Sequence, residues 1–357
     1  MGEMSSRERV LAALQHQIPD RVPYMEVLVD EAFGLRLLKR PPSPAPPPMS
    51  GSAPVTCAFF GGRAYGPLEL AEAMGLDGFC FGIQPRIYFV TRVADGQTYV
   101  VDGLIKRRAD LKLVDLPDPD DEGIYAPACE FLARYRPSGY AIGCFINLGS
   151  DPVLLSMGWE AFAYALYDDR TLVEALFDVY TDWYARAVRH ICRLGFDFIW
   201  AGDDIAGKNG PLLSPRLLRE LFLPYWRRVA EAITLPWIFH SDGNLAPVLD
   251  DLLSLGMNAL HPIEPPAMDI AALKRRIGER VTLVGNIDIN VLATGTPEEV
   301  EHLTRETIRQ AAPGGGYILS SSNSVTSACR VENVLAMVRA CREYGRYPLA
   351  ALQDDAM

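Results

Sequence analysis

The sequence has little of what marks proteins that bind nucleic acids or membranes. Its 34 Lys and Arg are outnumbered by 45 Asp and Glu, so the net charge is -11 and the pI is near 5.0. An acidic surface repels nucleic acid and anionic membranes, which excludes both as main partners. No apolar run reaches the roughly 18 residues of a membrane-spanning helix. With 49% hydrophobic residues, the chain can instead bury a sizeable core.

Patterned cysteines and a secretory leader are also missing. The seven cysteines include no CxxC pair, which predicts reduced thiols and no disulfide framework. The opening "MGEMSSRERVLAALQHQ" is too charged for a secretory signal. We therefore expect a cytoplasmic globular protein.

No GxGxxG or GxxxxGK[ST] motif supports a nucleotide-binding open sheet, which stays the alternative to a closed barrel. Eight strand-like segments are present, and nearly every one is followed by a helix-like stretch. Such alternation predicts parallel strands, and eight βα units close most naturally into an α/β (β/α)8 TIM barrel. The expected strands are 22–29, 78–83, 140–146, 197–202, 236–241, 258–263, 280–287 and 316–322. The expected helices are 122–135, 171–194, 214–233, 246–255, 269–277, 297–311 and 331–344.

Three further segments complete the expected single domain of residues 1–357. An N-terminal helix begins after a cap at Ser5 or Ser6 and is ended by Pro19. Residues 41–56 are so rich in proline that we expect an exposed loop inserted into the barrel. Residues 88–107 predict a short hairpin that turns at Asp95-Gly96.

Polar side chains gather where the expected strands end. In a (β/α)8 barrel the active site forms at this end, and burying so many polar groups without a ligand would be costly. The candidate residues are Glu26, Gln84, Asn147, Asp203, Asp204, His240, Asp242, His261, Glu264, Asn286, Asp288, Ser320, Ser321, Ser322 and Asn323.

The stretch "WIFHSDGNL" contributes the strongest pair of candidates. His240 and Asp242 lie two residues apart, so they share a face of an extended chain. Such a pair can orient a catalytic imidazole or hold a metal ion through nitrogen and oxygen. The adjacent Asp203 and Asp204 predict a raised pKa or a bound cation, although only one of them needs to face the centre.

Several of these residues also have a purely structural interpretation. Asp242 and Asn244 could cap the helix that follows them, and Asp288 could cap the next turn. Ser214 is expected to cap a helix. His261 is favoured as a hydrogen-bonded histidine of the core.

Longer motifs resemble those of the uroporphyrinogen decarboxylase superfamily. They are "HSDGNLAPVLDDLLSLGMNALHPIEPPAMDIAALKRRIGERVTLVGNIDINVLATGTPEEV", then "GGGYILSSSNS", with "GDDIAGKNGPLLSPRLLRELFLPY" before them. The resemblance covers nearly the whole chain except the proline-rich segment. It implies a single (β/α)8 barrel and either decarboxylation or methyl transfer with corrinoid proteins.

The haem-pathway decarboxylase branch implies an arginine-rich segment after the first strand, an aspartate after the second and a histidine after the eighth. Here residues 24–32 contain no arginine, while Gln84 and Asn323 stand at the other two positions. A substrate with eight carboxylates would meet too little positive charge. We therefore do not expect that activity.

The methyltransferase branch implies a zinc site of His-x-Cys after strand five and a second Cys after strand eight. The matching positions hold His240, Asp242 and Asn323, so the two thiolates are missing. Zinc could still bind His240 and Asp242, with Glu264 or Glu26. Alternatively no metal binds, and His240 with Asp242 acts as a general acid.

From this resemblance we predict a methyltransferase that moves a methyl group from a small O- or N-methylated metabolite to a corrinoid. The chain lacks the DxHxxG signature of corrinoid binding, so a partner protein would carry that cofactor. His240, Asp242, Asp203 and Asp204 are the expected catalytic residues. The expected substrate contacts are Glu26, Gln84, Asn147, Glu264, Asn286 and Asn323. Decarboxylation of a smaller carboxylate and a non-catalytic ligand sensor remain alternatives, and a homodimer stays open.

Overall fold

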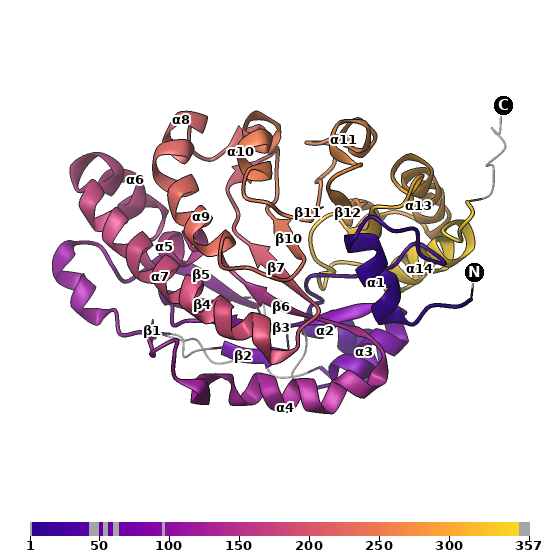
Figure 1. Cartoon of the computed structure of the whole chain (residues 1–357), viewed down its shortest axis with the longest axis horizontal. Coiled ribbons are helices and arrows are strands. Elements are labelled where there is room, and N and C mark those ends of the chain that lie inside the picture. The colour runs from indigo at the N-terminus through magenta and orange to yellow at the C-terminus, as the bar shows by residue number, and fades with distance from the viewer. Residues whose placement is uncertain (1, 43–49, 53–55, 60–63, 95–96, 350–357) are drawn as a thin grey trace.

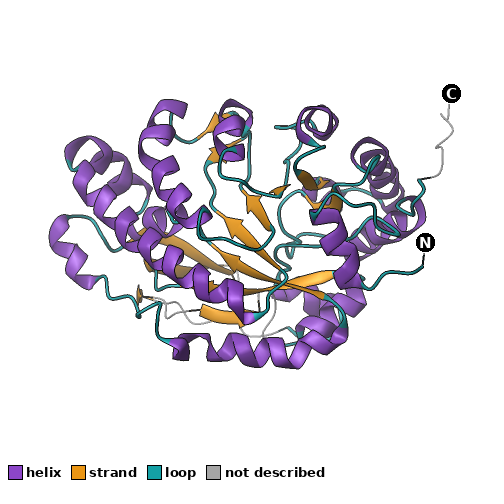
Figure 2. Cartoon of the chain, viewed as in Figure 1, coloured by secondary structure: helices purple, strands orange, loops and turns teal. Residues whose placement is uncertain are grey.

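The computed structural model describes residues 2–42, 50–52, 56–59, 64–94 and 97–349 (Figure 1). Its centre is a curled sheet in the order β13-β12-β11-β10-β7-β6-β3-β2, with helices around the outside (Figure 2). The seven strands from β3 to β13 run parallel, while β2 joins the edge antiparallel. The strands are β2 (Thr56–Phe59), β3 (Gly78–Gln84), β6 (Ala141–Ile146), β7 (Phe198–Gly202), β10 (Trp237–His240), β11 (Ala259–His261), β12 (Thr282–Ile287) and β13 (Tyr317–Ser321).

Burial explains why these segments are strands. Every residue of β6, β7, β12 and β13 is buried, as expected for parallel strands that are covered on both faces. Seven of the eight predicted strands are confirmed, and the sheet they form is α/β and TIM-barrel-like.

Among the described residues, each predicted helical stretch contains a helix, and five further α-helices (α2, α3, α5, α6 and α12) were not predicted. The helices are α1 (Ser6–Leu14), α2 (Glu31–Leu37), α3 (Pro67–Met74), α4 (Ala126–Tyr135), α5 (Ser150–Met157), α6 (Trp159–Asp168), α7 (Arg170–Leu194), α8 (Pro215–Leu217), α9 (Leu223–Ala230), α10 (Leu249–Leu253), α11 (Ile270–Ile277), α12 (Ile289–Thr294), α13 (Pro297–Ala311) and α14 (Val331–Tyr344). A π-helical turn, η4 (Leu218–Phe222), links α8 to α9. Within the described part of the chain, no helix is both long and apolar enough to cross a membrane.

The expected first strand, residues 22–29, is not a regular strand, so this prediction was wrong. It makes only single bridges, from Tyr24 to Leu319 and from Val29 to Val325. Pro23 has no N–H to donate, and the N–H of Tyr24 bonds the Asp77 carboxylate instead of a neighbouring strand. The segment still bridges the two outer strands of the parallel set, β13 and β3. The Met25 N–H donates to the carbonyl of Leu319 in β13, and the N–H of Asp77, just before β3, donates to the carbonyl of Tyr24.

The hairpin prediction is confirmed, but the prediction of a loop over residues 41–56 is not. Strands β4 (Tyr88–Ala94) and β5 (Gln97–Gly103) pair antiparallel, while the expected turn at 95–96 lies outside the described residues. Residues 43–49 and 53–55 of the proline-rich segment also lie outside them. Ser50–Ser52 forms strand β1, which pairs with β4 because the hairpin edge offers free backbone groups.

Helix α1 begins as predicted, with Ser5 as its cap in a capping box with Glu8. It ends at Leu14, ahead of Pro19, because the chain turns at His16, whose φ is 57°.

One buried carboxylate fixes the N-terminal segment to the sheet. Asp77 is fully buried and accepts hydrogen bonds from Arg9 (2.7 Å) and from both terminal nitrogens of Arg21 (2.8 Å each). It also accepts from the Ser6 hydroxyl and from the Tyr24 N–H at 2.9 Å each. Arg9 is itself only 3% exposed, so each of the two buried charges depends on the other to offset the loss of its hydration.

We expect Asp77→Asn to lower the free energy of unfolding by about 3–5 kcal/mol, since it leaves buried Arg9 without one of its counter-ions. Glu220→Gln is the matched control, because it removes an exposed pair with Arg216 four residues away on the surface. Urea unfolding of the two variants measures the difference. Equal, small losses would contradict the assigned role of Asp77.

Candidate functional site

Two histidines meet at the carboxyl ends of neighbouring strands. His240 ends β10 and His261 ends β11, and the register of the two strands makes them direct partners. Their Nδ1 atoms are 2.6 Å apart, and His261 is fully buried and packs nearly perpendicular to the ring of Trp200. Burial lowers the pKa of His261 well below its usual range and also lowers the pKa of His240, which the Asp204 carboxylate opposes. Both imidazoles are therefore neutral near pH 7.

Two carboxylates face the other nitrogen of His240. Its Nε2 lies 3.5 Å from Asp204 Oδ1 and 3.9 Å from Asp242 Oδ1. The Asp242 N–H donates to Asp204 Oδ1 at 3.1 Å, and the Asn323 amide donates to Asp242 Oδ2. We call Asp204, His240 and Asp242 the His240 cluster.

Asp242 is the most perturbed member of the His240 cluster. Burial, with the neighbouring charges of Asp204 and Glu264, raises the pKa of Asp242 to about 8. Its Oδ1 is buried and has no hydrogen-bond partner. An unsatisfied buried oxygen is rare in a folded protein, so it indicates a place for a proton, an ion or a ligand.

The His240 cluster fits a metal ion. One ligand atom from each of its three residues lies within 4.8 Å of the others. One imidazole nitrogen and two carboxylate oxygens suit zinc or a harder divalent ion. The unpartnered Asp242 Oδ1 is the atom that such an ion would satisfy.

The adjacent Asp203 points elsewhere. It is fully buried and accepts the backbone N–H groups of Ser150 (3.1 Å) and Asp151 (2.9 Å), which begin helix α5. A carboxylate in this place satisfies free donors of the helix end and interacts favourably with its dipole. The structure thus separates the two acids: Asp204 belongs to the His240 cluster and Asp203 holds α5.

Of the predicted substrate contacts, some lie beside the His240 cluster and others do not. Asn323 touches Asp242 directly, and Glu264 accepts the N–H of Gly243 at 2.8 Å, beside the His240 cluster. Asn286 of β12 donates to the carbonyl of Ile263 at 2.9 Å, which ties this strand to the segment that follows β11.

Gln84, Asn147 and Glu26 lie further from the His240 cluster. The Gln84 amide donates to Asn147 at 2.9 Å, and Asn147 donates to the carbonyl of Gly202. Glu26 is bound by Ser320 and Ser321 of β13 and reaches His240 only through other residues.

Asp242 is not a helix cap, whereas Asn244 accepts the N–H of Ala246 at 3.0 Å. Asp288 and Ser214 cap α12 and α8 as predicted.

Sequence reasoning missed Asp151 as part of the site. Its Oδ1 accepts the N–H of Asp204 at 3.1 Å, and burial with the charge of Asp203 raises its pKa well above the usual range. The signal was weak, because the start of α5 after the third predicted strand carries no side-chain cap.

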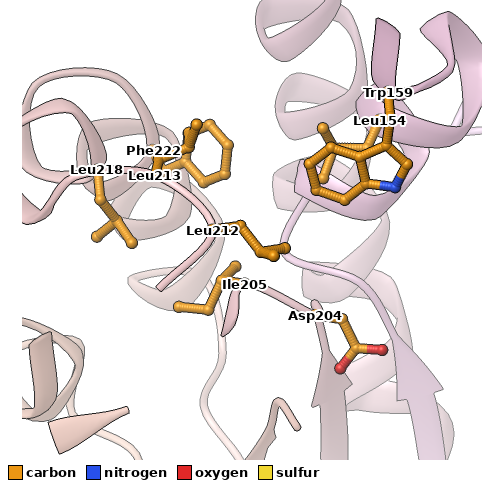
Figure 3. A pocket seen from close by; sticks show the side chains of 8 residues that line it. All are labelled: Leu154, Trp159, Asp204, Ile205, Leu212, Leu213, Leu218 and Phe222. Atoms are coloured by element: carbon orange, nitrogen blue, oxygen red, sulfur yellow. The ribbon is translucent and has the colours of Figure 1, made fainter. Parts of the chain in front are cut away.

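An apolar pocket adjoins the His240 cluster. Its cavity volume is about 10 Å³, the space of about one water molecule, and Asp204 is the one charged residue that lines it (Figure 3). Trp159 and Leu212 stay 53% and 47% exposed, a high value for such large apolar side chains. The remaining walls come from α5 and from the segment that leads from β7 into η4. They include Leu154, Ile205, Leu218 and Phe222. The pocket therefore offers an apolar surface next to Asp204 that the apolar part of a small molecule can contact.

Known proteins resemble this chain in sequence. It is 29% identical over 187 residues to a methylated-thiol–coenzyme M methyltransferase of Methanosarcina mazei, covering 52% of this chain and 48% of that protein. The chain thus spans about half the length of this curated relative. It is 25% identical over 255 residues to a uroporphyrinogen decarboxylase of Methylococcus capsulatus, covering 67% of this chain and 70% of the relative.

The fold and the family agree with the resemblance in the sequence. A solved methyltransferase from Methanosarcina mazei superposes with a TM-score of 0.72 at 20% identity, covering 96% of this chain and 99% of that one. At this identity the likeness shows the fold alone. A family model described as uroporphyrinogen decarboxylase (URO-D) matches residues 93–344. Since this match spans more than half of the sequence, the chain belongs to the URO-D family.

Proposed function

We propose that this protein is a cytoplasmic methyltransferase with a single (β/α)8-like barrel, in which the irregular segment 22–29 joins the two edges of the seven parallel strands. It would move a methyl group from a small O- or N-methylated metabolite to a corrinoid carried by a partner protein. The observation that carries this proposal is the His240 cluster, whose Asp242 Oδ1 has no partner, beside an apolar pocket.

Removing a methyl group from oxygen or nitrogen requires a stabilised leaving group. An alkoxide or amide is a poor leaving group at neutral pH unless a proton or a metal neutralises its charge. With a pKa of about 8, Asp242 still holds a proton at pH 7. It can therefore protonate the leaving oxygen or nitrogen as the methyl departs.

Zinc is the other means of stabilising that charge. When bound, zinc would supply a Lewis acid, with His240, Asp204 and Asp242 as its ligands. The two means exclude one another, because a carboxylate that binds zinc cannot also hold the proton.

Charge in the site favours a methyl donor over a polycarboxylate. Neither the lining of the pocket nor the described hydrogen-bond partners of Asp204 and Asp242 include lysine or arginine. A substrate with several carboxylates would meet like charges here and no guanidinium fork. An uncharged or cationic donor with an apolar body suits the pocket better.

The name of one relative supports a corrinoid as the methyl acceptor. A methylcobamide:CoM methyltransferase, MtaA, of Methanosarcina barkeri is 26% identical over 173 residues. Its name includes a methylated cobamide, which supports a corrinoid as the group that exchanges methyl here. Since the sequence has no DxHxxG signature, we propose that a separate protein carries it.

A panel of O- and N-methylated compounds, given with cob(I)alamin and the matching corrinoid protein, tests the proposal. We expect a spectral change from cob(I)alamin to methylcobalamin, slowed at least about 100-fold in His240→Ala and Asp242→Ala. Asp288→Ala is the matched control, because this acid directly follows β12 but only caps α12. An unchanged cob(I)alamin spectrum with every compound of the panel would contradict the proposal.

Decarboxylation of a small carboxylate is the second candidate. The protonated Asp242 could give its proton to the carbanion that remains after carbon dioxide leaves. Release of carbon dioxide without any corrinoid would favour this reaction over methyl transfer.

Zinc binding can be measured separately from activity. If the His240 cluster holds zinc, elemental analysis gives one zinc per chain, and His240→Ala and Asp242→Ala lose it. His190→Ala, which alters a surface pair with Asp120, keeps the metal. Zinc that persists in His240→Ala would place the ion elsewhere.

The raised pKa of Asp242 also predicts how stability varies with pH in the metal-free protein. The folded state binds a proton between the ordinary pKa of 3.8 and the folded value of about 8, so stability falls as pH rises across this range. Asp242→Asn lacks that titration, and it should gain stability relative to wild type between pH 5 and pH 8. The gain is at most about 1.4 kcal/mol per pH unit. Urea unfolding with a chelator measures it, and parallel stability curves would contradict the assignment.

A further inference from the structure

A line of buried hydrogen bonds runs from Glu26 to His240. The Ser320 hydroxyl donates to Glu26 Oε2 at 3.1 Å and lies 3.3 Å from His261 Nε2. His261 Nδ1 is in turn 2.6 Å from His240 Nδ1. Glu26 is 4% exposed, while Ser320 and His261 are fully buried. Water therefore has little access to this line, and its members must satisfy each other.

Glu26 fixes the direction of donation. It accepts the Ser321 N–H at 3.0 Å and the Ser321 hydroxyl at 2.6 Å, in addition to the Ser320 hydroxyl. Burial raises the pKa of Glu26 to about 7, against the opposite effect of Ser321 and Ser320. At pH 8 the group is mainly a carboxylate, which can only accept.

Each later bond follows from this first one. Since the Ser320 hydrogen points to Glu26, its lone pairs face His261, and His261 Nε2 must be the donor. A neutral imidazole has one N–H, so His261 Nδ1 is then an acceptor and His240 Nδ1 carries the hydrogen between them. The lone pair of His240 is left on Nε2, which faces Asp204 and Asp242.

We propose that Glu26, Ser320 and His261 are positioning residues that hold His240 in the tautomer with hydrogen on Nδ1 and a free lone pair on Nε2. With hydrogen on Nε2 instead, His240 would donate to the acids and could not bind a metal or take a proton there. The inference concerns His240 whichever reaction the site performs, so it goes beyond the proposed methyl transfer.

The packing of the strands supports this role. Trp200 meets the His261 ring at 82° with centroids 4.9 Å apart, which restricts its rotation. The register of β10 and β11 brings the two imidazoles together, and their rings are tilted by only 30°. The line thus joins three strands and the N-terminal segment through side chains that have little freedom to turn.

Nitrogen NMR of the 15N-histidine protein at pH 8, with a chelator, reads the tautomer directly and requires no substrate. The chain has five histidines, and single His→Gln variants assign their signals. We expect hydrogen on Nδ1 of His240 in wild type. In Ser320→Ala the ratio of the two tautomers should shift by about tenfold, the effect of one lost buried hydrogen bond.

Ser322→Ala is the matched control. Ser322 is a buried serine of the same run, but it accepts the N–H of Ile289 and makes no described bond to His261. It should leave the His240 tautomer unchanged, and Ser320→Thr, which restores the hydroxyl, should recover the wild-type ratio. Hydrogen on Nε2 in the wild type overturns the proposal. An unchanged ratio in a folded Ser320→Ala protein also overturns it. If Ser320→Ala does not fold, the wild-type tautomer alone decides.

Discussion

The buried carboxylate of Asp77 determines the path of the N-terminal segment, and the interior of the site depends on that path. By accepting the N–H of Tyr24, Asp77 fixes where this segment lies between β13 and the start of β3. Glu26 follows two residues later and reaches Ser320 and Ser321. A slip of one residue would turn Glu26 to the other face and leave a buried acid without donors. An ion pair at one end of the sheet thus places a carboxylate behind the histidines.

The strands that sequence analysis identified are those whose burial leaves a mark on the sequence. β6, β7, β12 and β13 are buried along their whole length, because helices cover the outer face of the curled sheet and a second cluster of apolar side chains fills its inner face. Residues 22–29 have a similar apolar pattern but not regular pairing, because Pro23 and Asp77 take away its ladder bonds. Helices α5 and α6 were missed because both begin after a glycine that offers no side-chain cap. Composition alone could not indicate these local effects.

The sequence predicts which way a site residue points where the spacing along the chain sets that direction. It does not predict it where tertiary packing sets the direction. His240 and Asp242 share a face because they lie two residues apart, and the structure brings both toward Asp204. Nothing in the sequence tells which of two adjacent acids turns inward; Asp203 turns to the free N–H groups of α5. His261 is buried, as favoured from the sequence, yet it also contacts His240, because strand register is a property of the pair of strands.

The electrostatics of the site connect its histidines to its acids. Burial keeps both imidazoles neutral and raises the pKa of Asp242, so the resting site avoids placing several charges together. The Nε2 lone pair of His240 can accept either a proton or a metal ion. Asp242, in contrast, must lose its proton before its carboxylate can bind a metal ion. Metal binding therefore has to release a proton from Asp242, and it weakens as pH falls below about 8. The same raised pKa that makes Asp242 a proton donor thus opposes metal binding, so pH and metal supply together select the chemistry open to this site.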